Sequence, residues 1–306
     1  MKKVHLHFTL LLTALCLSSA CNSGQKANGA SASDSTSVDS AMAQETMVEN
    51  ETFTTDSVVF NKENEHASCY ICVDIPKGNA KVVPTISKYI TTKLMACNSN
   101  YEIGDEAKQS VSGMPTDVKM QVDFFGKRYL GMLTNDHKDA CDVLEGENKE
   151  EDWKPSPFSQ EINIRIKENT EKYVTYHLYT YNYMGGAHGQ ALFIPVTFLK
   201  STGEMLQTTI DSSNEKAIQP LIRKGVISYF KKRGETVTDR DLNTMLFIEN
   251  GIIPIPINAP SLTAKGLHFV YQQYEIGPYA MGIVKFTVPY SEIKPYLTPK
   301  AAKLIQ

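Results

Sequence analysis

The residue best suited to chemistry in this chain is His188, which lies in the glycine-rich segment 181–189. An imidazole in a tight loop can act as a general base or a metal ligand. Possible partners elsewhere in the sequence are His177, Asp211, His268 and Glu275. None of them stands at a metal-ligand spacing such as HExxH, and no Gly-x-Ser-x-Gly motif accompanies them. We therefore expect the imidazole to bind loop carbonyls and fix the turn, and we predict no catalytic residue, metal or cofactor.

A second segment of similar character, residues 274–282, follows about a hundred residues later. We call residues 181–189 the glycine loop and residues 274–282 the proline loop. Glycine enters left-handed conformations without steric cost, and proline stiffens a turn, so both loops are expected to be rigid. Two stiff, aromatic-rimmed loops are more typical of a recognition surface than of a catalytic pocket. The predicted ligand-binding residues are Tyr181, Tyr183, Gly185, Gly186, His188, Glu275, Pro278 and Tyr279.

Two of these predictions have a purely structural alternative. Tyr279 beside Pro278 suits a binding hot spot, because a rigid aromatic loses little entropy on docking. It could equally pack back onto its own sheet. Alternate tyrosines between Tyr173 and Tyr183 could stack against sugar rings, but in the middle of the strand we expect them to pack beneath a helix. The balance shifts toward binding for Tyr181 and Tyr183, which lie nearest the loop.

Periodicity places these loops at the ends of strands. Alternating patterns predict strands at 57–62, 67–75, 120–125, 161–167, 172–183, 191–199, 267–274 and 283–288. Helical spacing predicts a helix after Pro84, with Ile86, Ile90, Leu94 and Cys97 on one stripe, and helices at 220–232 and 239–247. We read the charge-dense residues 146–152 as a solvated loop. The predicted fold class is α+β, with antiparallel sheets built of hairpins and helices packed on one face.

The amino-terminal residues indicate export. Two lysines precede an apolar run of ten residues, which is too short to span a bilayer, so residues 1–20 read as a signal peptide. Small residues before Cys21 predict lipidation of that cysteine and attachment to a membrane. Ordinary cleavage after Ala20 is the alternative. Residues 21–56 are rich in Ser, Ala, Asp and Gly and read as a flexible linker, followed by folded units at 57–153 and 154–306.

Composition limits the possible partners. The formal net charge is −3, and no basic cluster exceeds residues 231–233, so nucleic-acid binding has no electrostatic support. Four cysteines remain after the leader and Cys21: Cys69, Cys72, Cys97 and Cys141. They allow three disulfide pairings, among which the sequence does not choose. Cys69 and Cys72 are predicted to face opposite sides of a strand, so they do not pair with each other.

Both loops also carry a family resemblance. The pattern Tyr-x-Gly-Gly-Ala-His-Gly at 183–189, and Tyr-Glu-Ile-Gly-Pro-Tyr-Ala-x-Gly at 274–282 running into Val-Pro-Tyr-Ser-Glu-Ile at 288–293, resemble the RsiV-like domain family. The resemblance covers roughly residues 57–297 and is specific from about 150 onward. It implies an extracytoplasmic binding module of α+β fold. Members include the outer part of a lysozyme-sensing anti-sigma factor and the region preceding some peptidoglycan deacetylase domains.

These observations predict an exported bacterial lipoprotein, anchored in the cell envelope, that binds a ligand without catalysis. The resemblance suggests a lysozyme-type muramidase or a peptidoglycan-type glycan as that ligand. A hydrolase or deacetylase acting on cell-wall polymers is the alternative, and it requires His188, Glu275 and another polar group to meet in one concave site. A purely structural envelope component is the third reading, and it predicts no aromatic patch at the two loops.

Overall fold

A computed structural model describes residues 51–96, 112–147 and 155–305 of the chain. The predicted signal peptide, Cys21, nearly all of the predicted linker, Cys97 and residues 148–152 of the predicted charged loop lie outside these ranges. Within them, none of the helices is both long enough and apolar enough to cross a bilayer.

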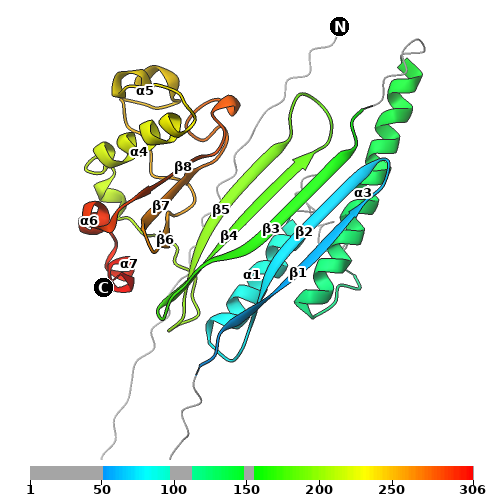
Figure 1. Ribbon diagram of the computed structural model, residues 1–306, viewed down its shortest axis with the longest axis horizontal. Helices are drawn as coiled ribbons and strands as arrows, with labels where there is room; N and C mark the ends of the chain where they lie inside the picture. Colours follow the sequence, from blue (N-terminus) through cyan, green and yellow to red (C-terminus); the bar gives the residue numbers. More distant parts are fainter. Residues whose placement is uncertain (1–50, 97–111, 148–154, 306) are drawn as a thin grey trace, which may run out of the picture. The chain divides into compact units, whose positions relative to one another are not determined.

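The larger sheet has five strands in the order β1-β2-β3-β4-β5 (Figure 1). The strands are β1 (Thr54–Glu63), β2 (Ala67–Lys77), β3 (Phe158–Asn169), β4 (Tyr173–Tyr183) and β5 (Gln190–Leu199). Three neighbouring pairs are antiparallel hairpins, as the sequence predicts, whereas β2 and β3 run parallel. A parallel pair needs a crossover, and the chain makes it through helices α1 (Val82–Ala96) and α3 (Val118–Glu147).

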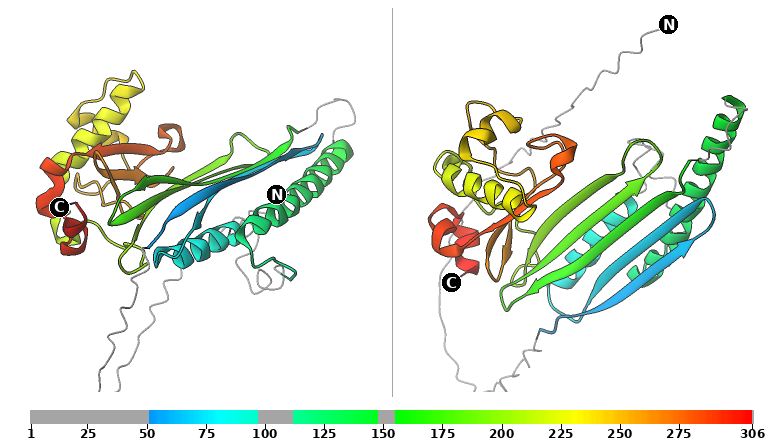
Figure 2. Two further views of the ribbon diagram at one scale, coloured as in Figure 1. Left: turned by 60° about the horizontal axis from the view of Figure 1, so that its bottom comes forward. Right: turned by 45° about the horizontal axis from the view of Figure 1, so that its top comes forward.

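Both crossover helices lie against the same face of this sheet (Figure 2). The predicted stripe Ile86, Ile90 and Leu94 is buried on α1 beneath the strands. On the sheet, the alternate residues Val174, Tyr176 and Leu178 of β4 belong to the same hydrophobic core. Burial of this helix–sheet layer supplies the main stabilisation of the larger sheet.

One predicted strand is wrong. Residues 120–125 alternate apolar and polar side chains, but they form part of the long helix α3. The buried residues of this helix are Val122, Phe125, Tyr129 and Leu133, at spacings of three and four. Met120 is 60 % exposed, so the alternation that suggested a strand was a coincidence within a short window.

The second sheet has three antiparallel strands, β6 (Ser261–Thr263), β7 (Gly266–Tyr271) and β8 (Val284–Val288). Helices α4 (Gln219–Lys232) and α5 (Asp239–Met245) match the predicted helices, and Pro220 occupies the first turn of α4. The remaining short elements are η1 (Ser212–Asn214), η2 (Tyr279–Met281), α6 (Tyr290–Ile293), η3 (Lys294–Tyr296) and α7 (Pro299–Leu304). The α+β class is therefore confirmed.

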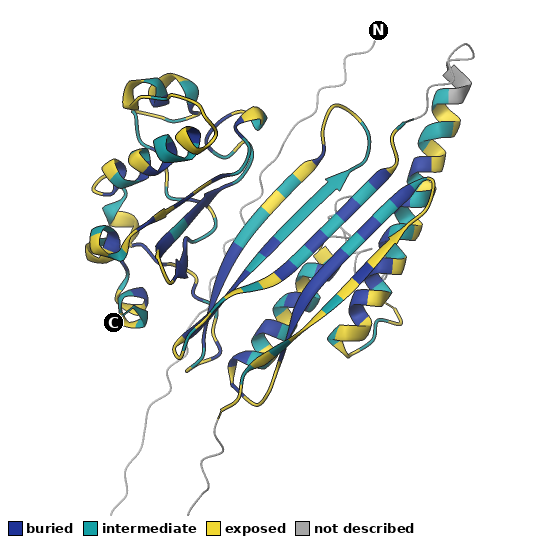
Figure 3. Ribbon diagram, viewed as in Figure 1, coloured by how far each residue is buried: buried dark blue, intermediate teal, exposed yellow. Residues whose placement is uncertain are grey.

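The second sheet contacts the face of β4 and β5 that α1 and α3 leave uncovered. The hydroxyl of Thr175 on β4 donates to the Leu262 carbonyl of β6 at 2.9 Å. Tyr173 is buried in the core of the second sheet. Helices α1 and α3 thus cover the Val174 face of β4, and the second sheet with its own helices covers the Tyr173 face. Residues 173–176 at the start of β4 are therefore all buried, whereas β3 alternates between buried and less buried residues (Figure 3).

The division of the chain at residue 153 remains a proposal. Strand β2, from the first predicted unit, pairs with β1 on one side and with β3, from the second predicted unit, on the other.

Among the described residues, Cys69, Cys72 and Cys141 are free thiols. Cys69 is packed in the helix-side core, where burial raises the pKa of its thiol to about 12. Cys72 accepts a hydrogen bond from Arg165 on the other face, so the two cysteines point apart as predicted.

Candidate functional site

The glycine loop joins β4 to β5 at one end of the larger sheet. Gly185 and Gly186 have φ values of +88° and +82°. A residue with a side chain would be strained in this left-handed conformation. The Tyr183 hydroxyl donates to the Gly186 carbonyl at 3.2 Å, which ties the loop to the strand before it. The residues after the turn are exposed up to His188, whereas Gly189 is buried. The hairpin therefore presents His188 from a fixed turn.

The proline loop joins β7 to β8, and Glu275 is one of the residues that fix it. One oxygen of the Glu275 carboxylate accepts the Gln272 backbone N–H at 2.7 Å, and the other accepts the Ile257 N–H at 2.8 Å. Burial raises the pKa of this carboxyl, and the two backbone hydrogen bonds oppose that rise. Pro278 then precedes the single turn η2, which begins at Tyr279. Glu275 thus has a structural role in the loop.

The two loops meet. The imidazole of His188 stacks on the ring of Tyr279, with centroids 3.7 Å apart and planes inclined by 16°. The Tyr279 hydroxyl donates to the Gly189 carbonyl at 2.7 Å. The Nδ1 atom of His188 lies 3.1 Å from the same carbonyl, as expected for a histidine that fixes its own turn. Tyr274 adds a tilted contact with Tyr279 at 5.8 Å. Two segments ninety residues apart therefore form one aromatic cluster.

Two glutamines strengthen this junction. The Oε1 atoms of Gln272 and Gln273 accept the backbone N–H groups of Phe193 and Ala191, at 2.9 and 3.1 Å. The Nε2 atom of Gln272 also donates to the Phe193 carbonyl at 2.7 Å. The free edge of β5 is thus paired with side chains in place of another strand. The sequence carries no recognisable signal for this role, because two glutamines after a strand are an ordinary surface pattern.

The tyrosines nearest the glycine loop lie on the face of β4 that the helices do not cover. Tyr179, Tyr181 and Tyr183 alternate along the strand and are each partly exposed. The pKa of Tyr179 is raised, mainly by burial and to a smaller extent by the charges of Glu161, Tyr181 and Tyr279. Glu161 on β3 lies opposite Tyr181 and accepts a hydrogen bond from the Asn163 amide at 2.6 Å. Phenol rings and carboxylate and amide groups are thus interleaved beside the loop cluster.

The other possible partners of His188 are engaged elsewhere. His177 stacks on His268 at 5.9 Å between the two sheets. Asp211 accepts the Ser213 backbone N–H and caps η1. Among the described residues, no three His, Cys, Asp or Glu side chains gather in an arrangement suited to a metal ion. The structure therefore joins His188, Tyr279 and the end of the tyrosine strand, while Glu275 supports the proline loop from behind.

Comparison with protein families gives two matches. Residues 60–191 match the family described as "Deacetylase PdaC", and residues 209–291 match the family described as "Protein of unknown function (DUF3298)". The first includes the glycine loop, and the second includes the proline loop. No curated protein matches the chain.

Two solved structures share the fold. A DUF3298-family protein from Bacteroides fragilis is 14 % identical with a TM-score of 0.56, covering 84 % of this chain and 98 % of its own. A DUF3298-family protein from Pseudomonas aeruginosa is 13 % identical with a TM-score of 0.50, covering 83 % and 97 %. At these identities the likeness establishes the fold alone. The two family matches support the likeness to the RsiV-like and PdaC group.

Proposed function

We propose that this protein is an extracytoplasmic binding module that recognises a peptidoglycan-type glycan without acting on it chemically. The family matches point to a cell-wall-related protein outside the cytoplasm, and the PdaC match suggests the glycan relationship. Lipidation at Cys21 and attachment to the cell envelope belong to the same proposal. The observation that carries it is the stacked contact of His188 on Tyr279, which joins both loops into one surface.

This surface has the composition that a sugar-binding site needs. Pro278 and His188 are exposed, and Tyr181, Tyr183 and Tyr279 are partly exposed. Aromatic faces provide rigid area at a low entropic cost, and the neighbouring Glu161 and Asn163 offer hydrogen-bonding groups for hydroxyls. Gly185 and Gly186 set the turn that presents them.

The arrangement favours binding over catalysis. The His188 imidazole is occupied on one side by Tyr279 and lies near its own loop carbonyl. Both oxygens of Glu275 accept backbone N–H groups. His188 and Glu275 thus do not provide a general base and a general acid directed at one substrate position.

A sedimentation assay with purified insoluble peptidoglycan tests the proposal. The variants His188→Ala and Pro278→Ser should weaken co-sedimentation about tenfold when combined, since they alter the exposed aromatic and proline contacts. Val143→Ala shortens an exposed apolar side chain on α3, away from both loops, and should leave binding unchanged. Equal binding by the parent chain, the combined loop variant and Val143→Ala would refute a role for the loops.

Two further measurements separate the alternatives. Calorimetric titration with a lysozyme-type muramidase tests a protein ligand, and tight binding there without glycan binding would replace the glycan assignment. Acetate release from acetylated peptidoglycan tests the deacetylase reading. Turnover that disappears in His188→Asn would overturn the non-catalytic assignment.

A further inference from the structure

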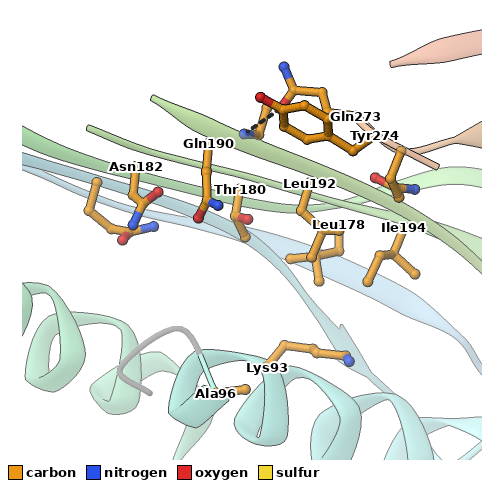
Figure 4. A pocket seen from close by; sticks show the side chains of 13 residues that line it. Lys93, Ala96, Leu178, Thr180, Asn182, Gln190, Leu192, Ile194, Gln273 and Tyr274 are labelled. Carbon is orange, nitrogen blue, oxygen red and sulfur yellow. Dashed lines mark hydrogen bonds between the residues drawn. The ribbon is translucent and has the colours of Figure 1, made fainter. Parts of the chain in front are cut away.

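A cleft of about 330 Å³ lies on the other face of β4 and β5, between the strands and the end of α1 (Figure 4). Its floor includes Leu178, Thr180 and Asn182, which alternate along β4 with the tyrosines of the open face. This floor therefore lies on the opposite face of β4 from the tyrosines proposed for glycan binding, and Tyr274, which contacts Tyr279, borders both regions. Its volume falls in the range of small-ligand sites.

The polar groups of this cleft are mostly amides with unused hydrogen-bonding capacity. Among the described residues, the side chains of Thr180, Asn182 and Gln190 have no hydrogen-bond partner. Gln160 and Gln273 contribute two more amides to the lining. A primary amide offers both a donor and an acceptor, which matches the N–H and C=O of a peptide unit.

A single charged side chain lines the described part of the cleft. The Lys93 side chain lies over α1 in the space between the helix and the strands (Figure 4), and the lining includes no Asp or Glu. Its ammonium lies 5.4 Å from the Tyr89 ring, and among the described residues no carboxylate lies within ion-pair distance of it. An anionic group on a ligand would therefore meet a cation that no carboxylate of the described chain neutralises.

The remaining lining is apolar and of modest size. Leu178, Leu192 and Ile194 project from the sheet beside the amides. Leu192 is 37 % exposed, although it is a large apolar side chain on a strand. Such walls suit small alkyl side chains, because burying methyl groups against them is favourable.

Tyr274 stands at the cleft in a strained conformation. Its φ is +66°, which is unfavourable for a bulky residue, yet its side chain is 58 % exposed and contributes little to the core. The neighbouring Gln272 and Glu275 hold the backbone through their hydrogen bonds. A glycine would relieve the strain, so the tyrosine ring itself is the feature that needs explanation.

We propose that this cleft binds a short peptide with small side chains and a free C-terminal carboxylate. The carboxylate pairs with Lys93, the peptide units hydrogen-bond to Thr180, Asn182 and Gln190, and the ring of Tyr274 covers the peptide at the entrance. This inference goes beyond the proposed function, since it assigns a second ligand to a different face of the sheet.

Calorimetric titration with alanine tripeptides of both chiralities, and with the same peptides as C-terminal amides, tests the proposal. At least one free acid should bind, and its amide should bind about tenfold more weakly, because the charge-assisted contact is lost. Lys93→Gln should abolish the difference between acid and amide. Lys88→Gln is the matched control on the same helix, because Lys88 is exposed and does not line the cleft.

Tyr274→Gly separates a binding role from a structural one. It should weaken tripeptide binding while leaving the melting temperature unchanged or raised, since the strain is removed. Failure of every tripeptide to bind, equal affinity for acids and amides, or no effect of Lys93→Gln would each overturn the assignment. Tighter binding of an N-acetylated sugar than of any tripeptide would also overturn it. Lys93→Gln should not alter co-sedimentation with peptidoglycan, because Lys93 lies on α1 at the helix-covered face of the sheet, so this proposal and the glycan proposal fail independently.

Discussion

The imidazole of His188 lies flat against the ring of Tyr279, and the Tyr279 hydroxyl reaches past it to the Gly189 carbonyl. A stack and a hydrogen bond thus close the contact between the glycine loop and the proline loop. Each loop is the end of a separate hairpin, one from each sheet. The contact therefore links the two sheets at the site where we propose that ligand is recognised.

We expect the contributions of His188 and Tyr279 to the free energy of unfolding to be coupled. Tyr279→Phe should cost about 1 kcal/mol through the lost hydrogen bond. His188→Ala should cost about 1 kcal/mol through the lost ring contact. The double variant should cost less than the sum, because each residue positions the other. Urea unfolding of the four proteins gives the coupling energy.

Tyr274→Phe is the control for the hydroxyl deletion. The exposed Tyr274 hydroxyl has no hydrogen-bond partner among the described residues, so its removal should change stability by less than about 0.5 kcal/mol. Strict additivity of His188→Ala and Tyr279→Phe would show that the rings do not depend on each other in solution.

Two glycines of the same loop should respond differently to alanine. At Gly189, a Cβ atom would lie 2.4 Å from Cζ of Tyr181 and 2.5 Å from the Asn182 carbonyl oxygen, so Gly189→Ala forces the strand end apart. At Gly186 the space is open, and only the left-handed backbone opposes a side chain. Gly186→Ala should cost about 1 kcal/mol, and Gly189→Ala about 2 kcal/mol or more. Thermal unfolding of both variants checks the order, and a larger loss for Gly186→Ala would contradict the packing at Tyr181.

The strands that end in these loops could be predicted from sequence, because residues 172–183 and 191–199 alternate over a long window. The loops themselves were recognisable from their glycines and proline. Their contact was not, since nothing local in the sequence relates His188 to Tyr279 across ninety residues. The parallel pairing of β2 with β3 does not follow from the sequence for a related reason: the alternation at residues 120–125 indicates a strand and conceals the long crossover helix.

The cleft and the edge glutamines lay beyond sequence reasoning altogether. Lys93 faces β4 only because α1 ends beneath the strands, and a helical pattern does not reveal which partner covers its last turn. Gln272 and Gln273 matter because they follow β7 at the place where β5 has a free edge. That placement depends on how the second sheet packs against the first.

The stacked pair His177 and His268 makes stability depend on pH. Burial, with smaller contributions from the charges of Lys167 and Lys285, lowers the pKa of each imidazole to about 4. His268 also lowers the pKa of His177, and Lys232 that of His268. An unfolded histidine has a pKa of 6.5, so between these values the unfolded chain binds more protons than the folded one. Stability should therefore be fully present above about pH 6.5 and should fall as the pH decreases toward 4.

Chemical denaturation at a series of pH values measures this dependence. Each imidazole contributes at most about 3 kcal/mol, since one pKa unit corresponds to about 1.4 kcal/mol. The Nε2 atom of His177 is buried without a hydrogen-bond partner, so His177→Phe should preserve stability at pH 7 and reduce the slope below it. An unchanged slope in that variant would assign the pH dependence to other groups.

A buried carboxylate anchors the centre of the larger sheet. The Asp74 side chain is 4 % exposed and accepts hydrogen bonds from the Arg165 Nε at 2.8 Å and the Ile166 backbone N–H at 3.0 Å. The Ser57 hydroxyl donates to the other carboxylate oxygen at 2.5 Å. Asp74→Ala should cost about 3 kcal/mol, because it leaves these three donors without their acceptor. Lys77→Ala breaks an ion pair with Asp56 in which both side chains are 58 % exposed, and it should cost less than about 1 kcal/mol. Similar losses for the two variants in urea unfolding would contradict this ranking.

The outer edge of β5 should promote self-association when the two glutamines that pair with it are removed. Ala191 and Phe193 direct their N–H groups at Gln273 and Gln272, and Pro195, the next residue of the same parity, has no N–H to expose. The double variant Gln272→Ala, Gln273→Ala leaves two N–H groups and a carbonyl free to pair with another strand. Sedimentation-velocity centrifugation should show stronger self-association than in the parent chain.

A compensating proline distinguishes edge pairing from general loss of stability. Ala191→Pro removes one of the exposed N–H groups at a position where an edge strand tolerates proline. Added to the double variant, it should reduce self-association toward that of the parent chain without restoring the unfolding free energy. If self-association persists at full strength, it arises from exposed apolar surface and the edge of β5 is not the point of contact. A return of self-association to the level of the parent chain would show that the two glutamine side chains protect the edge of β5 as a further strand would.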